Sequence, residues 1–296
     1  MSGISVVVLN HVRPEATRAC LASIGRNRYP DLRVVVVDTG AMPGAERLVR
    51  EVDLDVQLVA LGANRGYAGG VNAGLKVVLG DGAAWVLVLN DDVVLADDCI
   101  ERLAAAVDAD RTIGIAGPVI LQLGAPSTVL SAGGRLAVDW SADLLDAGAS
   151  IEHLRPDPRQ VDWVPGCAML ASAELCRDVG LLDERFFLYW EEVEWGLRAR
   201  RRGWRIVLVP DAHAWHGDGR EGLPSESVTY YITRNHLLAL AVHRAPVGVW
   251  LRTALRLAAT TASWSIRPKW CDRRANARAI KRGVADFMLR RFGERR

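Results

Sequence analysis

Residues 85–92 of the chain are WVLVLNDD, an apolar run that ends in one amide and two carboxylates. An apolar run without polar alternation is typical of a strand that is buried on both faces of a sheet. We expect this strand over residues 84–89. The segment 97–108 that follows has a helical pattern and an acidic start, which suits the positive end of the helix dipole. A strand that leads directly into a helix predicts one unit of a parallel αβ sheet.

The same alternation extends from this unit in both directions. Strands are expected over residues 4–9, 32–37, 56–61 and 113–120, and helices over residues 14–24, 45–52 and 69–79. Alternating strands and helices predict right-handed βαβ connections and a mainly parallel sheet flanked by helices, so the fold class is α/β. Further on, we expect loops with short strands over 121–162, helices over 173–179 and 188–202, a strand over 206–209 that ends at Pro210, and only helices after residue 226.

The composition indicates a folded protein with an uneven distribution of charge. Half of the 296 residues are hydrophobic, so the chain has enough apolar surface for a large core. The net charge is only +2, but residues 267–296 have a net charge of +8, which leaves about −6 for the rest. The five cysteines show no metal-binding spacing and no disulfide framework, and the N-terminus lacks the pattern of a signal peptide. We therefore expect a cytoplasmic, reduced protein.

Two nucleotide-binding folds are excluded at the first strand. The residues after it, His11 to Pro14, contain no glycine, whereas a dinucleotide fold needs G-x-G-x-x-G at this point. The phosphate-binding P-loop motif is absent from the whole chain. The glycine-rich loop of sugar-nucleotide pyrophosphorylases is missing too, which disfavours a nucleotidyltransferase.

Polar residues stand where several expected strands end. Asn10, Asp38, Asn64 and the group Asn90–Asp92 all occupy such positions. Each one alone is more often a turn or cap residue, but ligands of α/β sheets bind at the carboxyl ends of the strands, so together they indicate a site. The glycine-rich stretch 64–74 opens a helix and, with Arg65, is suited to bind an anion. The alternative is a glycine turn that allows close helix packing.

Two carboxylate groups are candidates for chemistry. Asp91 and Asp92 follow an apolar strand, where carboxylates need a cation or hydrogen-bond donors, and Mg²⁺ prefers oxygen ligands. The alternative is a capped turn. The run 191–194, Glu-Glu-Val-Glu, lies among aromatic residues, which raise a carboxyl pKa toward that of a useful base. The alternative is a surface helix with a Glu194–Arg198 pair, which we favour for Glu194 but not for Glu192.

Taken together, these segments resemble glycosyltransferase family 2, the inverting transferases of GT-A fold, and within it the bacterial rhamnosyltransferase-like branch. The resemblance extends over residues 4–240. It depends on the order of SVVVLN at 5–10, VVVD at 35–38, N-x-GYAGG-x-N-x-G at 64–74, LNDD at 89–92, PGCAML at 165–170, GLLDERFF at 180–187, EEVE at 191–194 and YY-x-x-RN at 230–235.

The resemblance implies a role for particular residues. Glu192 would be the general base, although the family usually has Asp there, and Asp92 with His216 would bind Mg²⁺ or Mn²⁺. The residues expected to contact the nucleotide and its diphosphate are Asn10, Asp38, Asn64, Arg65, Gly70, Asn72, Asn90, Asp91 and Arg234, and those expected beside the donor or acceptor sugar are Trp163, Gly166, Trp190 and Glu191.

The family also implies the organisation and the partners. We expect a Rossmann-like catalytic domain over residues 1–225, with the nucleotide half at 1–120 and the acceptor half at 121–225, and a helical basic region over 226–296. The expected reaction moves a sugar from a nucleotide-diphosphate donor, dTDP-rhamnose or another dTDP- or UDP-sugar, to a saccharide, lipid-linked or natural-product acceptor. A catalytically silent sugar-nucleotide-binding subunit is the alternative.

The basic C-terminal region suggests a second partner. Over residues 250–296, tryptophans alternate with arginines, which is typical of a surface that touches anionic lipid, here at the inner face of the cell membrane. The alternatives are a solvated helix and a contact within a homodimer. A nucleic-acid partner is not expected, because the rest of the chain contains a sugar-transfer site.

Overall fold

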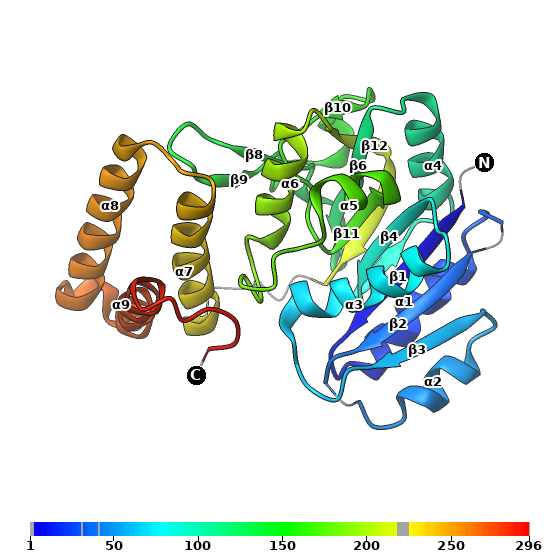
Figure 1. Ribbon diagram of the computed structural model, residues 1–296, viewed down its shortest axis with the longest axis horizontal. Helices are drawn as coiled ribbons and strands as arrows, with labels where there is room; N and C mark the ends of the chain where they lie inside the picture. The colour runs from blue at the N-terminus through cyan, green and yellow to red at the C-terminus, as the bar shows by residue number, and fades with distance from the viewer. Residues whose placement is uncertain (1–2, 31, 41, 218–224, 296) are drawn as a thin grey trace.

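The computed structural model describes residues 3–30, 32–40, 42–217 and 225–295 and has one large mixed sheet with helices on both faces (Figure 1). The strand order is β10-β12-β6-β11-β4-β1-β2-β3, with β5 and β7 paired to β12 and β6 respectively. The α/β fold class predicted from the alternating pattern is therefore confirmed.

The N-terminal half supplies the parallel part of the sheet. Its elements are β1 (Ile4–Asn10), α1 (Pro14–Gly25), β2 (Arg33–Asp38), α2 (Ala45–Glu51), β3 (Val56–Ala60), α3 (Gly66–Gly80), β4 (Trp85–Asn90), β5 (Val93–Leu95) and α4 (Cys99–Ala109). Strand β1 lies between β2 and β4 and is parallel to both, so their carboxyl ends meet at one edge.

The middle of the chain adds strands that run in both directions. Its elements are β6 (Ile113–Gln122), β7 (Ala125–Ser131), β8 (Gly134–Leu136), β9 (Ala142–Leu144), η1 (Ile151–His153), β10 (Arg159–Gln160), β11 (Ala168–Ser172), α5 (Ala173–Val179), α6 (Glu191–Arg201) and β12 (Arg205–His216). Strand β11 runs antiparallel to β4, so it begins opposite the end of β4.

Alternating side chains of the strands divide the core between two faces. Val6 and Val8 of β1 face α1, α2 and α4, whereas Val7 faces α3. Helices α5 and α6 complete the second face through Leu175 and Trp195, which are fully buried. The β-branched runs predicted from the sequence form strands because both of their faces are covered by helices.

The C-terminal helices form a group of their own at one end of the molecule (Figure 1). They are α7 (Glu226–Val242), α8 (Val247–Ile266), η2 (Pro268–Arg273) and α9 (Arg274–Met288). Among the helices that the structure describes, none is both long enough and apolar enough to cross a membrane. The predicted helical region after residue 226 is therefore confirmed, while the domain division at residue 225 stays a prediction.

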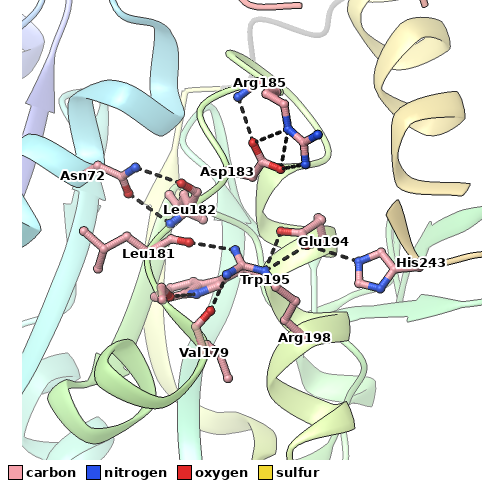
Figure 2. A network of polar contacts seen from close by, with 11 residues as sticks. Asn72, Val179, Leu181, Leu182, Asp183, Arg185, Glu194, Trp195, Arg198 and His243 are labelled. Carbon is pink, nitrogen blue, oxygen red and sulfur yellow. Dashed lines mark hydrogen bonds and ion pairs between the residues drawn. The ribbon is translucent and has the colours of Figure 1, made fainter. Parts of the chain in front are cut away.

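A buried ionic network joins this group to α6 and the segment before it (Figure 2). Glu194 of α6 accepts from Arg198 at 2.9 Å and lies 3.2 Å from Nε2 of His243, which follows α7. Arg198 also donates to the carbonyls of Val179 and Leu181. The predicted Glu194–Arg198 pair therefore forms, but Glu194 is 1 % exposed, so it lies inside the protein rather than on a surface helix.

Several boundaries differ from the expectation, and two of these differences have a clear physical reason. Strand β12 continues past Pro210 to His216, because the ladder with β6 tolerates an irregularity between Val209 and His213, and proline is accepted at such a bulge. Helix α6 begins at Glu191 rather than at residue 188, because Phe187, Tyr189 and Trp190 all have positive φ angles. Both boundaries lie next to the candidate site.

Candidate functional site

The carboxyl ends of β1 and β2 hold the first pair of predicted residues together. Asn10 and Asp38 are register partners, and Nδ2 of Asn10 donates to Oδ1 of Asp38 at 3.1 Å. Asp38 also accepts from the backbone amides of Gly40 and Met42, and Asn10 accepts from Thr17. Asn10 is fully buried and Asp38 nearly so, so this pair forms the floor of the strand-end site.

Asp92 and His216 meet because of a strand pairing. Strand β5 follows Asp92 directly and runs antiparallel to the end of β12, with Val93 opposite His216. Nε2 of His216 consequently lies 3.0 Å from Oδ1 of Asp92. Residues 124 positions apart in the chain are thus neighbours, and both are partly buried beside Asn90 and Asp91 at the end of β4.

The two aspartates have different electrostatic surroundings. Burial raises the pKa of Asp91, although the amide of His11 donates to its Oδ2 at 2.9 Å. Burial also opposes ionisation of Asp92, but His216 and Arg13 outweigh it, so the pKa of Asp92 is lowered. Arg13, which precedes α1, forms an ion pair with Asp92. The surroundings therefore favour the ionised form of Asp92 more than that of Asp91.

The residues around Asp92 fit a divalent cation that shares its coordination with a substrate. Oδ1 of Asp92, Nε2 of His216 and Oδ1 of Asn90 are all buried, yet none has a hydrogen-bond partner of good geometry. Within the described ranges, no group of three or more His, Cys, Asp or Glu residues could hold a metal ion by itself. Mg²⁺ commonly uses one or two protein ligands and completes its shell with substrate phosphates and water, so two ligands suffice.

The glycine-rich stretch combines a turn with close packing. Asn64 is exposed and accepts from the amide of Gly66 at 2.8 Å, which forms the turn before α3, and Arg65 beside it is exposed as well. A Cβ at Gly70 would lie 2.3 Å from a methyl carbon of Leu9, so this glycine lets α3 approach β1. Asn64 and Arg65 are thus available to a ligand, whereas Gly70 faces the sheet.

Two expected nucleotide contacts have their polar groups engaged elsewhere. Asn72 is buried and exchanges two hydrogen bonds with the backbone of Leu182, at 2.8 and 3.0 Å (Figure 2). Arg234 is fully buried in α7 and donates to the carbonyls of Phe186 and Gly293. The structure therefore places both side chains behind the site, where they fix the loop over residues 180–190.

The adjacent glutamates at the start of α6 differ in burial. Glu191 is 4 % exposed, and burial, followed by the charge of Glu192, raises its pKa well above the usual value. Glu192 is only half-buried. A pair of neighbouring carboxyl groups retains a proton on the more buried member. Burial therefore favours the protonated form of Glu191, and Glu192 is the more exposed member of the pair.

Tyr67 links these glutamates to the strand ends. Its hydroxyl donates to the carbonyl of Gly166, and Cys167 accepts from the amide of Asn90 at 3.0 Å. Burial, followed by the charge of Glu191, raises the pKa of Tyr67, so the hydroxyl remains a donor. Because β11 begins opposite the end of β4, the 165–167 loop lies between the aspartates and the glutamates.

The aromatic residues predicted near the sugar are mostly buried. Trp163 packs against Gly134, where a Cβ would lie 2.0 Å from its ring, and is 6 % exposed. Trp190 stacks on His236 of α7 with ring centroids 4.7 Å apart. Both tryptophans thus support the walls of the site, next to Gly166 and Glu191.

Sequence reasoning missed several side chains of this region. Arg13 and Tyr67 contact predicted site residues, but a lone arginine before a helix and a tyrosine in a glycine-rich run give no specific signal. In the sequence, Asn235 stands out only as part of the YY-x-x-RN pattern. Its contacts with the loop before α6, described below, depend on the three-dimensional packing of α7.

Comparison with known proteins agrees with this geometry. Residues 5–127 match the sequence model of a protein family that is described as Glycosyl transferase family 2. The N-acetylglucosaminyl-diphospho-decaprenol L-rhamnosyltransferase of Mycobacterium tuberculosis is 30% identical over 263 residues, which cover 80% of this chain and 85% of the relative. The dTDP-rhamnosyl transferase RfbF of Shigella flexneri is 25% identical over 232 residues, covering 74% of each chain.

A solved structure shares the fold. The mannosyltransferase PcManGT from Pyrobaculum calidifontis, solved with GDP-Man and Mn²⁺, has a TM-score of 0.62 and 16% identity, and the likeness covers 98% of this chain and 88% of that one. The predicted GT-A fold and the predicted likeness to the rhamnosyltransferase-like branch are both confirmed.

Proposed function

Since the chain belongs to glycosyltransferase family 2 and is a glycosyltransferase, we propose that it transfers a sugar from a dTDP- or UDP-activated donor to a hydroxyl group with inversion of configuration. The observation that most supports this proposal is the junction of β4, β5 and β12. There Asp92 and His216 lie 3.0 Å apart, at the strand ends where ligands of α/β sheets bind.

A divalent cation completes the proposed donor site. Asp92 and His216 would hold Mg²⁺ or Mn²⁺, and the ion, when bound, would offset the negative charge of the departing diphosphate. Asp38, whose carboxylate Asn10 holds in place, would bind the nucleoside, and Asp91 its ribose or deoxyribose. Asn64 and Arg65, which are exposed beside the N-terminus of α3, would contact the diphosphate.

Glu192 is the proposed general base. It lies in the first turn of α6, at the positive end of the helix dipole. Because Glu192 is the more exposed of the two carboxyl groups, it accepts the proton of the acceptor hydroxyl as that oxygen attacks the anomeric carbon. A single displacement inverts the anomeric centre. Asn72 and Arg234 would act by positioning the loop before α6, rather than by touching the diphosphate.

The relatives suggest the substrates. Two of them are named as rhamnosyltransferases, one for a decaprenol-linked and one for a dTDP-linked substrate. We therefore propose dTDP-rhamnose as the first donor to test and a lipid-linked saccharide as the acceptor. A catalytically silent subunit would bind the same donor without turnover.

A binding experiment tests the donor site. We expect dTDP or UDP to bind at least tenfold more tightly with Mn²⁺ than without it, and Asp92→Ala to remove this difference, as measured by isothermal titration. If metal-dependent affinity is the same in Asp92→Ala and wild type, the proposed metal site is wrong. Release of dTDP from dTDP-rhamnose by the wild type would exclude the silent subunit.

Helix α8 has an apolar face suited to an anionic membrane surface. Val247, Leu251, Leu255 and Ile266 are 60 to 75 % exposed and fall on one side of the helix, together with the exposed Ala258 and Ala262. Arg252 and Arg256 flank this side, and α8 contains no acidic residue. Pairing α8 with a second copy would bring like charges together, whereas an anionic lipid surface neutralises them, so we propose peripheral membrane contact rather than a homodimer.

Vesicle binding tests this contact. The protein should sediment with vesicles containing phosphatidylglycerol, and Leu251→Asp with Leu255→Asp should weaken that binding at least tenfold. Val138→Asp is the control, since Val138 is an apolar residue that is 91 % exposed outside α8. The proposal would be contradicted if Val138→Asp weakened vesicle binding as much as the α8 changes do. It would also be contradicted if the protein sedimented as a dimer that only the α8 variant disrupts.

A further inference from the structure

The loop that leads into α6 has an unusual backbone. Phe187, Tyr189 and Trp190 have φ angles of 66°, 67° and 77°, in the left-handed region that residues with a Cβ avoid. Three such residues within four positions, directly before the two glutamates, persist only if the surrounding structure holds them in place. The contacts that hold this loop therefore determine where the first turn of α6 begins.

Asn235 of α7 supplies most of those contacts. Its Nδ2 donates to the carbonyls of Phe186, Leu188 and Tyr189 at 2.7, 2.8 and 2.7 Å. The side chain is fully buried. An amide nitrogen has only two hydrogens, so the three carbonyls share them and must all point toward one atom. This convergence requires the tight, left-handed path of the loop.

Arg234 orients the amide of Asn235. Its Nε donates to Oδ1 of Asn235 at 3.0 Å, which turns Nδ2 toward the loop. Its Nη2 donates to the carbonyl of Phe186 at 2.9 Å, and its Nη1 to Gly293 in the C-terminal segment at 2.6 Å. The amide of Gly293 in turn donates to Arg185 at 3.1 Å. Helix α7 and the C-terminal segment thus hold the same loop from one side.

We propose that Asn235, oriented by Arg234, is a positioning residue that sets the direction of the first turn of α6 and thereby aims the carboxylate of Glu192 at the acceptor hydroxyl. This inference rests on the proposed function of Glu192. Asn235 contacts the loop and not the strand ends, so its loss should change the chemical step and leave the donor site intact. Misplacing a catalytic group by about 1 Å costs on the order of 100-fold in rate.

The test replaces Asn235 by Asp, which has nearly the same shape but no hydrogens to donate. We expect kcat to fall between about 10- and 100-fold. The donor KM and the affinity for dTDP with Mn²⁺ should stay within about threefold of wild type, because no strand-end residue is moved. Asn276→Asp is the matched control: Asn276 is also buried and donates to Thr229 between α9 and α7, away from the loop. Its kcat should remain at the wild-type level.

Any result other than these would overturn the proposal. A wild-type kcat for Asn235→Asp would show that the loop needs no such contact. Equal losses in Asn235→Asp and Asn276→Asp, or a parallel loss of dTDP binding, would show that Asn235 only stabilises the helix group. If Asn235→Asp does not fold, Arg234→Lys is subjected to the same measurements and the same criteria. Glu192→Gln is measured in parallel: full activity there refutes the base itself, whereas its inactivity with a fully active Asn235→Asp refutes only the positioning role.

Discussion

Replacing Gly66 by Ala tests the contact between the start of α3 and the loop before α6. Gly66 has a φ angle of +69°, and a Cβ there would lie 2.3 Å from the carbonyl oxygen of Phe187 and 2.6 Å from its ring. That carbonyl also accepts from the amide of Ala68 at 3.3 Å. The added methyl group must therefore push the loop away and break this hydrogen bond.

A second variant, at Gly82, separates the cost of the contact with Phe187 from the cost of the left-handed backbone. Gly82 follows α3 and has a φ angle of +87°, but a Cβ there meets nothing within 4 Å. Gly82→Ala should therefore cost only the left-handed backbone penalty, about 1 kcal/mol. Gly66→Ala should cost this plus about 2 kcal/mol of overpacking. For a chain of this length, 1 kcal/mol corresponds to a shift in Tm of roughly 2 °C.

Thermal unfolding of the two variants is the assay. The Tm of Gly66→Ala should lie about 3 to 4 °C below that of Gly82→Ala. Its kcat should fall as well, because the loop that it displaces leads to Glu192. If the two variants lose the same Tm and keep the same kcat, the close approach of α3 to Phe187 is refuted.

Three further predictions concern the charged groups. Glu191→Gln should raise Tm at pH 8 and leave it unchanged at pH 4. The raised pKa of Glu191 means that the folded state keeps a proton that the unfolded state releases above about pH 4.5, so the stability of the wild type falls as pH rises. A Tm difference that does not depend on pH would contradict this prediction. Arg198→Ala should lower the free energy of unfolding in urea by about 3 kcal/mol, because Glu194 is left buried and short of a donor, and a loss below about 1 kcal/mol would contradict that role. His216→Ala should weaken Mn²⁺-dependent dTDP binding about tenfold and leave metal-free binding unchanged in isothermal titration, and equal Mn²⁺-dependent affinity would remove His216 from the metal site.

Strands β1, β2 and β4 could be predicted from the sequence because they are buried on both faces. Runs such as residues 4–9 and 85–89 are continuously apolar, and their pattern does not depend on distant partners. For β12 the sequence predicts only a strand over 206–209 that ends at Pro210. Its continuation to His216 depends on β5 and β6, which pair with it on either side, and no local pattern reports that pairing.

The site could be predicted in part for the same reason. Asn10, Asp38 and Asn90–Asp92 follow recognisable strands, so their meeting at one edge follows from parallel topology. The sequence cannot show which polar residues are used by the fold itself. Asn72 is bonded to Leu182 and Arg234 to Phe186, contacts between segments more than 45 residues apart. An asparagine or arginine that holds a loop has the same sequence signature as one that binds a diphosphate.

The most direct test of the proposed chemistry measures dTDP release from dTDP-rhamnose in the presence of acceptor by Glu192→Gln and wild type, together with dTDP affinity in Mn²⁺. Gln is close in size to Glu but cannot accept a proton at neutral pH. We expect turnover to fall at least 100-fold while the affinity for dTDP stays within about threefold, since the base acts only in the chemical step. Turnover near the wild-type level in Glu192→Gln would contradict the assignment of the base and the mechanism built on it.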